Sequence, residues 1–122
     1  MKVLAIDDNQ LNLKLIDSAL GSHGHEVRLL EQPADAVAVA LEFQPELVLL
    51  DIEMPNRNGV EVMRDLRRCP GLTDIPIYAF TAMESEMVAA YVNPGEFTGV
   101  VRKPYSLRGL LALLAEAQKA SA

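Results

Sequence analysis

The sequence has few of the features that cross-link a chain, carry it through a membrane or bind polyanions. Its 122 residues include one cysteine, Cys69, which excludes an internal disulfide and is typical of a reducing compartment. No apolar run approaches the length of a membrane span. Only four apolar residues separate Lys2 from Asp7, too few for a signal peptide. We therefore expect a cytoplasmic protein without a membrane partner.

Positive charge is also scarce. The formal net charge is −6, and the lysines and arginines are scattered along the chain rather than gathered in a stripe. This argues against nucleic acid or an anionic membrane surface as the main partner. Internal repeats, low-complexity tracts and Gly/Ser linkers are missing too, so no domain boundary is expected. Half of the residues are apolar, which suits a single domain over residues 1–122.

Short apolar runs alternate with segments of helical periodicity. The runs predict strands at Lys2–Ile6, Glu26–Leu30, Glu46–Leu50, Ile75–Phe80 and Gly99–Arg102. Helices are predicted at about 10–20, with Asp8 or Asn9 as N-cap, from Pro33 to before Pro45, at 59–68, at 83–92, and after a Ser106 cap. The residues expected to face the core are Leu11, Leu15, Ile16, Ala19 and Leu20 in the first helix, Ala34, Val37, Ala38 and Leu41 in the second, Val62, Met63 and Leu66 in the third, and Leu107, Leu110, Leu111 and Leu114 in the last.

This alternation predicts a fold class. Strands that alternate with helices form a parallel sheet with right-handed crossovers and helices on both faces. We expect an α/β, flavodoxin-like, doubly wound five-stranded parallel sheet with five helices and strand order 2-1-3-4-5. The first, third and fourth strands are the most uniformly apolar and suit its centre, whereas Glu26 and Arg28 suit an edge strand.

Polar residues follow four of the predicted strands. Asp7 and Asp8 follow the first, Asp51 the third, Thr81 the fourth and Lys103 the fifth. The carboxyl ends of parallel strands meet at one edge, which is where ligands bind in open α/β sheets. Asp51 alone could equally be a turn or helix cap. The joint pattern indicates a functional site.

The chemistry of such a site follows from its charges. Crowded carboxylates repel one another, so a cation must compensate them. Mg²⁺ suits the site because it takes carboxylate, water and phosphate oxygens. Asp8 and Asp51 are the expected side-chain ligands, Asp7 is expected to bind partly through water, and Lys103 supplies a fixed positive charge. Such a site can hold a phosphoryl group, and Asp51 can attack it as a nucleophile.

Four motifs of the chain carry a resemblance to a known family: Asp7-Asp8-Asn9, Asp51 with Met54-Pro55 and Gly59, Thr81-Ala82, and Lys103-Pro104-Tyr105. Together they resemble the receiver domain of two-component response regulators, of the single-domain or hybrid-kinase and phosphorelay type. The resemblance covers nearly the whole chain. It implies that Asp51 accepts phosphate from a histidine kinase or a histidine phosphotransfer protein. We also expect output through another protein, unless the sequence is a piece of a longer chain, and a monomer or weak homodimer.

The same resemblance assigns roles to the site residues. It implies that Asp7, Asp8 and Asp51 hold Mg²⁺ together with the main-chain carbonyl of Glu53. Thr81 would hydrogen-bond the phosphoryl oxygen and Lys103 would pair with it. The domain would assist its own phosphorylation and dephosphorylation, without being an enzyme that acts on other substrates. The Lys103-Pro104 bond is commonly cis in this family.

Some residues depart from the family pattern or allow two interpretations. The family's switch aromatic usually stands three residues before the lysine, where this chain has Val100, and Glu96-Phe97 replaces the common Gly-Ala pair before the fifth strand. Asn12, after Asn9 on the first helix, resembles the pattern of hybrid-kinase and phosphorelay receivers, although it could equally lie on a solvated helix face.

Two alternative functions follow from these patterns. One is a receiver-like adaptor that binds partners without phosphorylation, which Val100 makes conceivable and the complete acidic site disfavours. The other is a hydrolase with an aspartyl-phosphate intermediate. Hydrolases of the haloacid dehalogenase type place Asp-x-Asp after the first strand, whereas here Asp7 and Asp8 are adjacent.

Overall fold

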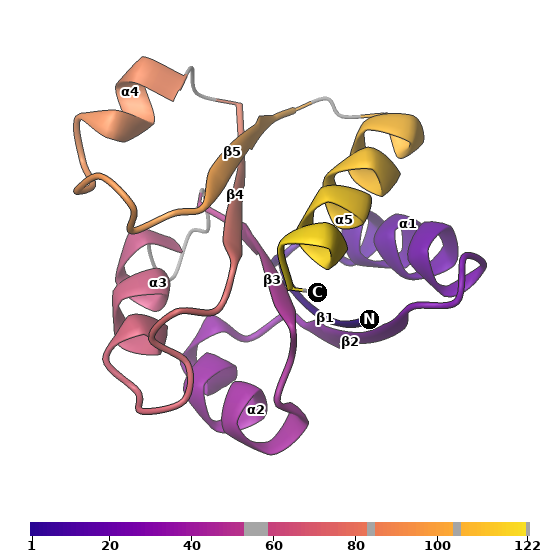
Figure 1. Cartoon of the computed structure of the whole chain (residues 1–122), viewed down its shortest axis with the longest axis horizontal. Helices are drawn as coiled ribbons and strands as arrows, with labels where there is room; N and C mark the ends of the chain where they lie inside the picture. Colours follow the sequence, from indigo (N-terminus) through magenta and orange to yellow (C-terminus); the bar gives the residue numbers. More distant parts are fainter. Residues whose placement is uncertain (53–58, 83–84, 104–105, 122) are drawn as a thin grey trace.

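The computed structural model describes residues 1–52, 59–82, 85–103 and 106–121, and its centre is a five-stranded sheet (Figure 1). All paired strands are parallel, and their order is β2-β1-β3-β4-β5. The strands are β1 (Lys2–Ile6), β2 (Glu26–Leu30), β3 (Leu47–Asp51), β4 (Ile77–Thr81) and β5 (Gly99–Arg102). This order is the predicted one, so the flavodoxin-like doubly wound fold is confirmed.

Helices cover both faces of the sheet. In Figure 1, α1 and α5 lie on one side of the strands, and α2 and α3 lie on the other. The helices in the described residues are α1 (Gln10–Gly21), α2 (Ala36–Phe43), α3 (Gly59–Arg67), α4 (Ser85–Ala89) and α5 (Leu107–Ser121), with a short 3₁₀ turn, η1 (Pro33–Asp35), before α2. Five helices were predicted, and the fourth is shorter than its predicted span of 83–92, part of which lies outside the described residues.

The sheet separates two hydrophobic clusters. One cluster joins β1, β3 and β4 to α1 and α5, and the other joins the same strands to α2, α3 and α4. Every residue of β3 is buried, as expected of a central strand covered on both faces. Glu26 and Arg28 of β2 are exposed at the edge, as predicted. The burial of β3 fixes the position of Asp51, its last residue.

The inward face of α1 agrees with the predicted one at Ile16 and Leu20 but not at Leu11 and Leu15. Leu11 and Leu15 are 65% and 57% exposed, whereas Leu13, Ile16 and Leu20 are buried against the sheet. Two apolar stripes are available on this helix, and both have helical spacing. The stripe that packs is the one whose residues Leu13, Ile16 and Leu20 join the cluster between the sheet and α5.

The predicted inward faces of two other helices also need correction. In α2 the buried residues are Ala36, Ala40 and Phe43, while Leu41 is 49% exposed and Ala34 and Ala38 are exposed too. The segment opens with a 3₁₀ turn, which rotates 120° per residue instead of 100° and shifts the face that follows. At the start of α5, Leu107 is 50% exposed, whereas Leu110 and Leu114 are buried as expected.

Two strands extend one residue further than predicted at their carboxyl ends. The third strand was predicted over Glu46–Leu50 and is observed over Leu47–Asp51. The fourth was predicted over Ile75–Phe80 and is observed over Ile77–Thr81, since Pro76 lacks the N–H that a ladder needs. Asp51 and Thr81 are therefore the last residues of their strands, with backbones held in the sheet.

Two arginines of α3 connect this helix to the loop before β5. Arg64 donates to both carboxylate oxygens of Glu96, from Nε at 3.1 Å and from a terminal nitrogen at 3.2 Å. Arg67 donates to the main-chain carbonyl of Glu96 at 3.0 and 2.8 Å. The N–H of Asn93 donates to the same carboxylate at 2.7 Å. We call Arg64, Arg67 and Glu96 the arginine bridge.

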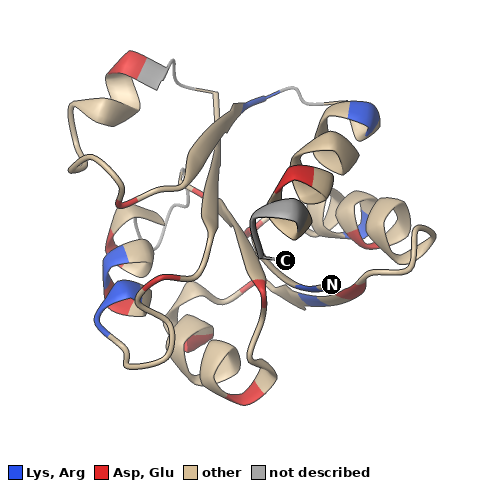
Figure 2. Cartoon of the chain, viewed as in Figure 1, with Lys and Arg blue, Asp and Glu red and all other residues tan. Residues whose placement is uncertain are grey.

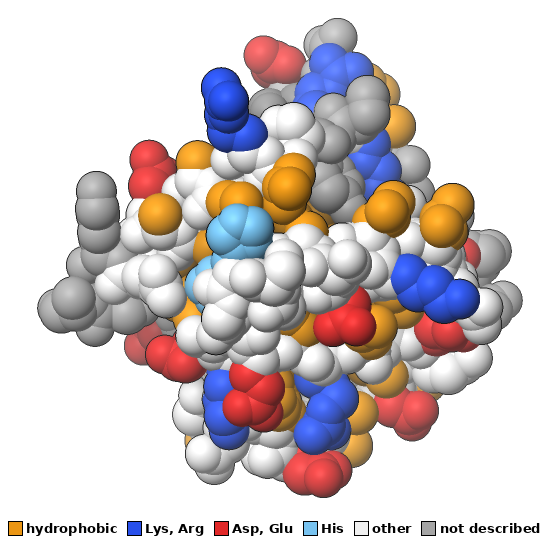
Figure 3. Space-filling view, turned by 90° about the vertical axis from the view of Figure 1, so that its right-hand side faces the viewer, with side chains coloured by type: hydrophobic (Ala, Val, Ile, Leu, Met, Phe, Trp, Pro, Cys, Tyr) orange, Lys and Arg blue, Asp and Glu red, His pale blue; other side chains and the backbone are white. Residues whose placement is uncertain are grey.

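Charged and apolar side chains are mixed over the surface. Figure 2 shows acidic and basic residues on most elements of the ribbon, without one basic face. On the side that includes α1, hydrophobic side chains lie in separate places between charged ones (Figure 3). No helix among the described residues combines the length and the apolar character that a membrane crossing requires.

Candidate functional site

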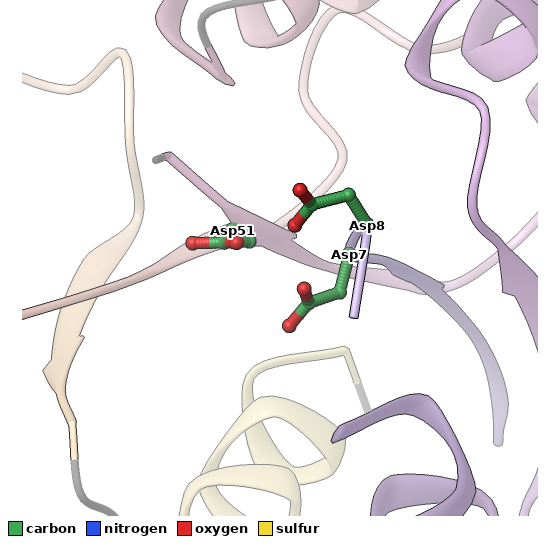
Figure 4. A group of neighbouring side chains, drawn as sticks. All are labelled: Asp7, Asp8 and Asp51. Atoms are coloured by element: carbon green, nitrogen blue, oxygen red, sulfur yellow. The ribbon is translucent and has the colours of Figure 1, made fainter. Parts of the chain in front are cut away.

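Three aspartates meet at the carboxyl edge of the sheet. Asp7 and Asp8 follow β1 and reach toward the end of β3, which carries Asp51 (Figure 4). Since β1 and β3 are neighbouring parallel strands, with Ile6 opposite Leu50, their ends emerge side by side. One carboxylate oxygen from each aspartate lies within 4.8 Å of the others. Asp7 and Asp51 are 3% and 4% exposed, and Asp8 is exposed.

Lys103 brings a positive charge to this cluster. Its Nζ lies 3.3 Å from Oδ1 of Asp51 and 3.8 Å from Oδ2 of Asp7. The backbone after β5 is fixed at this point because the N–H of Lys103 donates to the carbonyl of Thr81 at 2.8 Å. The ammonium therefore reaches the carboxylates from a strand two positions away in the sheet.

Thr81 is fully buried at the end of β4, beside the end of β3. The structure thus brings five of the six predicted site residues to one edge of the sheet: Asp7, Asp8, Asp51, Thr81 and Lys103. The sixth, Glu53, lies outside the described residues, as do the motif residues Met54-Pro55 and Pro104-Tyr105 and hence the predicted cis bond at Pro104.

The start of α1 holds Asp7 in place. Asn9 is the N-cap, and its side chain accepts hydrogen bonds from the N–H groups of Leu11 and Asn12. The N–H of Asn9 donates to Oδ1 of Asp7 at 2.9 Å, and the side-chain amide of Asn12 donates to Oδ2 at 3.2 Å. The contact between Asn12 and Asp7 was not predicted, although the helical position of Asn12 was noted.

Gly59 lies directly against the backbone of the site. Its N–H donates to the carbonyl of Ile52 at 3.0 Å. A Cβ atom at this position would lie 2.5 Å from the carbonyl oxygen of Asp51 and 2.6 Å from Cα of Ile52. Such distances are too short for any side chain, so α3 can begin beneath Asp51 only with glycine.

The charge and chemistry of the cluster suit a divalent cation. Three carboxylates face a single ammonium, that of Lys103, among the described residues of the site. The remaining negative charge matches an ion of charge +2, and the ligands are all hard oxygens. Mg²⁺ prefers such ligands and usually keeps several waters and phosphate oxygens. The donor set therefore fits Mg²⁺.

The fold and this edge define a class of protein: a doubly wound α/β domain whose clustered carboxylates and lysine can take a phosphoryl group. Residues 3–115 match the family described as the response regulator receiver domain, and the chain belongs to that family. Receiver domains are phosphoryl-accepting switches of two-component systems. They bind Mg²⁺ at an acidic pocket and interact with histidine kinases or phosphotransfer proteins and with downstream effectors.

Individual proteins to which the chain is similar are response regulators or receiver domains as well. The polar-differentiation response regulator DivK of Brucella anthropi is 30% identical over 105 residues, which cover 86% of this chain and 85% of DivK. The chemotaxis protein CheY4 of Vibrio cholerae is 26% identical with a TM-score of 0.89, covering 95% of this chain and 97% of that one. The BeF₃-activated receiver domain of Klebsiella pneumoniae RstA is 29% identical with a TM-score of 0.84, covering 96% and 97%.

Proposed function

We propose that Asp51 is the phosphoryl acceptor of this receiver domain, which we take to be a single domain over residues 1–122. The observation that carries the proposal is the environment of Asp51. This buried carboxylate ends the central strand β3, has the Lys103 ammonium 3.3 Å from one oxygen and lies in the cluster with Asp7 and Asp8. Transfer of a phosphoryl group depends mainly on positioning and on stabilisation of charge, and this environment supplies both.

In the proposed reaction, a carboxylate oxygen of Asp51 forms a bond to phosphorus while the bond from phosphorus to its donor atom breaks. The donor atom keeps that electron pair. With a phosphohistidine of a histidine kinase or phosphotransfer protein, the leaving atom is an imidazole nitrogen, which then takes a proton. With acetyl phosphate, the leaving group is acetate. The acyl phosphate formed on Asp51 is later hydrolysed, so the domain assists its own phosphorylation and dephosphorylation.

Asp8 and Asp51 are the proposed side-chain ligands of Mg²⁺, with Asp7 bound partly through water and the carbonyl of Glu53 as a further ligand. When bound, the ion neutralises charge on the phosphoryl oxygens. Lys103 then pairs with the phosphoryl group from its place between Asp7 and Asp51. Thr81, at the end of β4, donates a hydrogen bond to a phosphoryl oxygen.

The contribution of Thr81 to switching can be compared with what a switch needs. A hydrogen bond to a charged group contributes about 1.5 to 3 kcal/mol. Moving a two-state equilibrium from about 1:99 to 99:1 needs about 5.5 kcal/mol. Thr81 alone therefore falls short, and Lys103, the cation or a partner protein must supply the rest.

Incubation with acetyl phosphate and Mg²⁺ tests the proposal. We expect the mass of the chain to increase by one phosphoryl group, with the modification mapped to Asp51 and absent from Asp51→Asn. Continuous release of phosphate from added phosphomonoesters, without such an adduct, would favour the hydrolase. Neither adduct nor turnover, in a chain that still binds its partners, would favour the phosphorylation-independent adaptor.

A further inference from the structure

Asp7 is held by more neighbours than its role as a partial, water-mediated ligand requires. Its Oδ1 accepts the N–H of Asn9 at 2.9 Å, and its Oδ2 accepts the side-chain amide of Asn12 at 3.2 Å with the Lys103 ammonium 3.8 Å away. The carboxylate is 3% exposed, so these donors replace most of its water. Two of the three donors come from the N-cap and the first turn of α1.

The geometry of α1 explains how Asn12 reaches Asp7. Asn9 accepts the N–H groups of Leu11 and Asn12, which fixes the backbone of the first turn. Side chains on a helix point back toward its N-terminus, and from the third helical residue this direction leads to the end of β1. Asn12 is accordingly half-buried instead of lying on the solvated face.

The chemical type of Asn12 matters for a site that must bind a cation. Its amide donates a hydrogen bond without adding charge, so the excess of carboxylates over the Lys103 ammonium stays available to a divalent ion. A lysine or arginine in its place would also donate to Asp7 but would repel the ion. An aspartate would offer no donor and would add a further repulsion.

We propose that Asn12 is a positioning residue that holds the Asp7 carboxylate in one orientation and thereby sets the affinity and selectivity of the site for Mg²⁺. This inference rests on the proposed function, since it concerns the ion that phosphorylation uses. Mg²⁺ requires near-ideal octahedral geometry, whereas Ca²⁺ accepts variable geometry. Without the Asn12 hydrogen bond, Oδ1 of Asp7 keeps the N–H of Asn9 but Oδ2 keeps only the more distant Lys103 ammonium among these three donors. The carboxylate is then less firmly oriented, which weakens Mg²⁺ binding more than Ca²⁺ binding.

The test is a titration of Mg²⁺, and separately of Ca²⁺, into the unphosphorylated chain, followed by amide NMR shifts. Substitution of residues that orient metal ligands typically costs tenfold or more in affinity. We expect Asn12→Ala to raise the Kd for Mg²⁺ by about tenfold and to lower the preference for Mg²⁺ over Ca²⁺. Asn12→Gln keeps an amide donor and should recover part of the loss. Ser18→Ala, on the exposed face of the same helix, is the matched control and should leave both Kd values unchanged.

The outcomes separate the inference from the function on which it rests. A Kd for Mg²⁺ in Asn12→Ala within twofold of that in Ser18→Ala would overturn the inference. Equal weakening of Mg²⁺ and Ca²⁺ would also overturn it, because a purely structural role predicts no change in selectivity. If acetyl phosphate and Mg²⁺ leave no phosphoryl adduct on Asp51 of the unsubstituted chain, the proposed function fails instead, whatever the Kd values of the Asn12 variants. Thermal unfolding in EDTA identifies any variant that has lost its fold.

Discussion

Lys103 shows how a single side chain can make a crowded acidic site compatible with a folded state. Asp7 and Asp51 are buried, and burial of an unpaired carboxylate is costly. The ammonium lies within 4 Å of both, so it offsets part of this cost before any cation binds. The negative charge that remains is what a divalent ion can neutralise. The same residue therefore supports the metal-free fold and leaves the site able to bind.

Val100 lies beside a cavity that a larger side chain could occupy. The cavity has a volume of about 320 Å³ and lies between α4 and the start of β5, lined by Val88, Val92, Phe97 and Val100 among others. We expect Val100→Phe to extend into it and to stabilise the fold by about 1 kcal/mol, because it removes more apolar surface from water. Val100→Ala should destabilise by about 1 kcal/mol. Urea denaturation followed by circular dichroism measures both.

The expected result is that the free energy of unfolding rises in Val100→Phe and falls in Val100→Ala. Equal destabilisation by Val100→Phe and Val100→Ala would mean that residue 100 cannot turn into the cavity. In the family pattern an aromatic residue occupies this position. The smaller side chain of Val100 at this position therefore goes together with an unfilled cavity beside it.

The identity of the site residues was easier to predict than their contacts. Asp7, Asp51 and Lys103 each end or follow an apolar run, and a parallel sheet brings such ends to one edge. The bond from Asn12 to Asp7 could not be predicted with the same ease, because it depends on the rotation of α1 about its axis. That rotation is set by the packing of Leu13, Ile16 and Leu20 in the core, which periodicity alone does not determine.

The beginning of α3 is the element most tightly constrained by the site. Gly59→Ala would place a methyl group 2.5 Å from the carbonyl oxygen of Asp51, so either the helix or the end of β3 must move. We expect a loss of about 3 kcal/mol in the free energy of unfolding, since the contact is with backbone that cannot rotate away. Slower phosphorylation of Asp51 should accompany it, because its backbone is displaced.

Gly21→Ala provides the matched control for Gly59→Ala. Gly21 is the last residue of α1, and an added Cβ would meet no atom within 4 Å beyond its chain neighbours and the adjoining backbone of its own helix. Alanine is favoured over glycine in helices by up to about 1 kcal/mol, so this variant should be as stable as the original chain or slightly more stable. Similar unfolding curves for the two variants would contradict the role assigned to Gly59.

The bounds of several strands could be predicted from the sequence, whereas the buried face of a helix could not be predicted where apolar residues are too abundant. Strands β1, β2 and β5 have the predicted bounds because polar residues or turns flank each run. In α2 almost every residue is apolar, so several faces fit the helical period equally well. The face of α2 that is buried against the sheet carries Ala36, Ala40 and Phe43, and the 3₁₀ turn before the helix sets its rotation.

The arginine bridge links parts of the molecule that are far apart in sequence, and it predicts a pH dependence of stability. The hydrogen bond from Arg64, then that from the N–H of Asn93, hold the pKa of Glu96 below the 4.5 of an unperturbed glutamate. The folded state therefore binds fewer protons at Glu96 than the unfolded state. The stabilising contribution of the ionised Glu96 carboxylate is complete above pH 4.5 and is lost as the pH falls through the lowered pKa.

Comparison with Glu96→Gln isolates this effect from other carboxylates. The original chain should be more stable than the variant at neutral pH, and the difference should shrink as the pH falls below 4.5. Added salt should also reduce the difference, since the Arg64 side chain is 37% exposed. Urea unfolding at several pH values measures it. A difference that does not change with pH would assign the effect of residue 96 to packing alone.

The strand order has a consequence for how the chain acquires its structure during synthesis. β1 is synthesised before the other strands of the sheet, yet it pairs on one side with β2 and on the other with β3, whose Leu47 lies opposite Val3. Until residues 47–51 have been translated, the hydrogen-bonding groups of β1 on that side have no strand to pair with. Such long-range pairing slows folding and leaves an open edge to which other nascent chains can add. The vulnerable interval ends when β3 emerges, which is also the moment at which Asp51 first meets the two aspartates that follow β1.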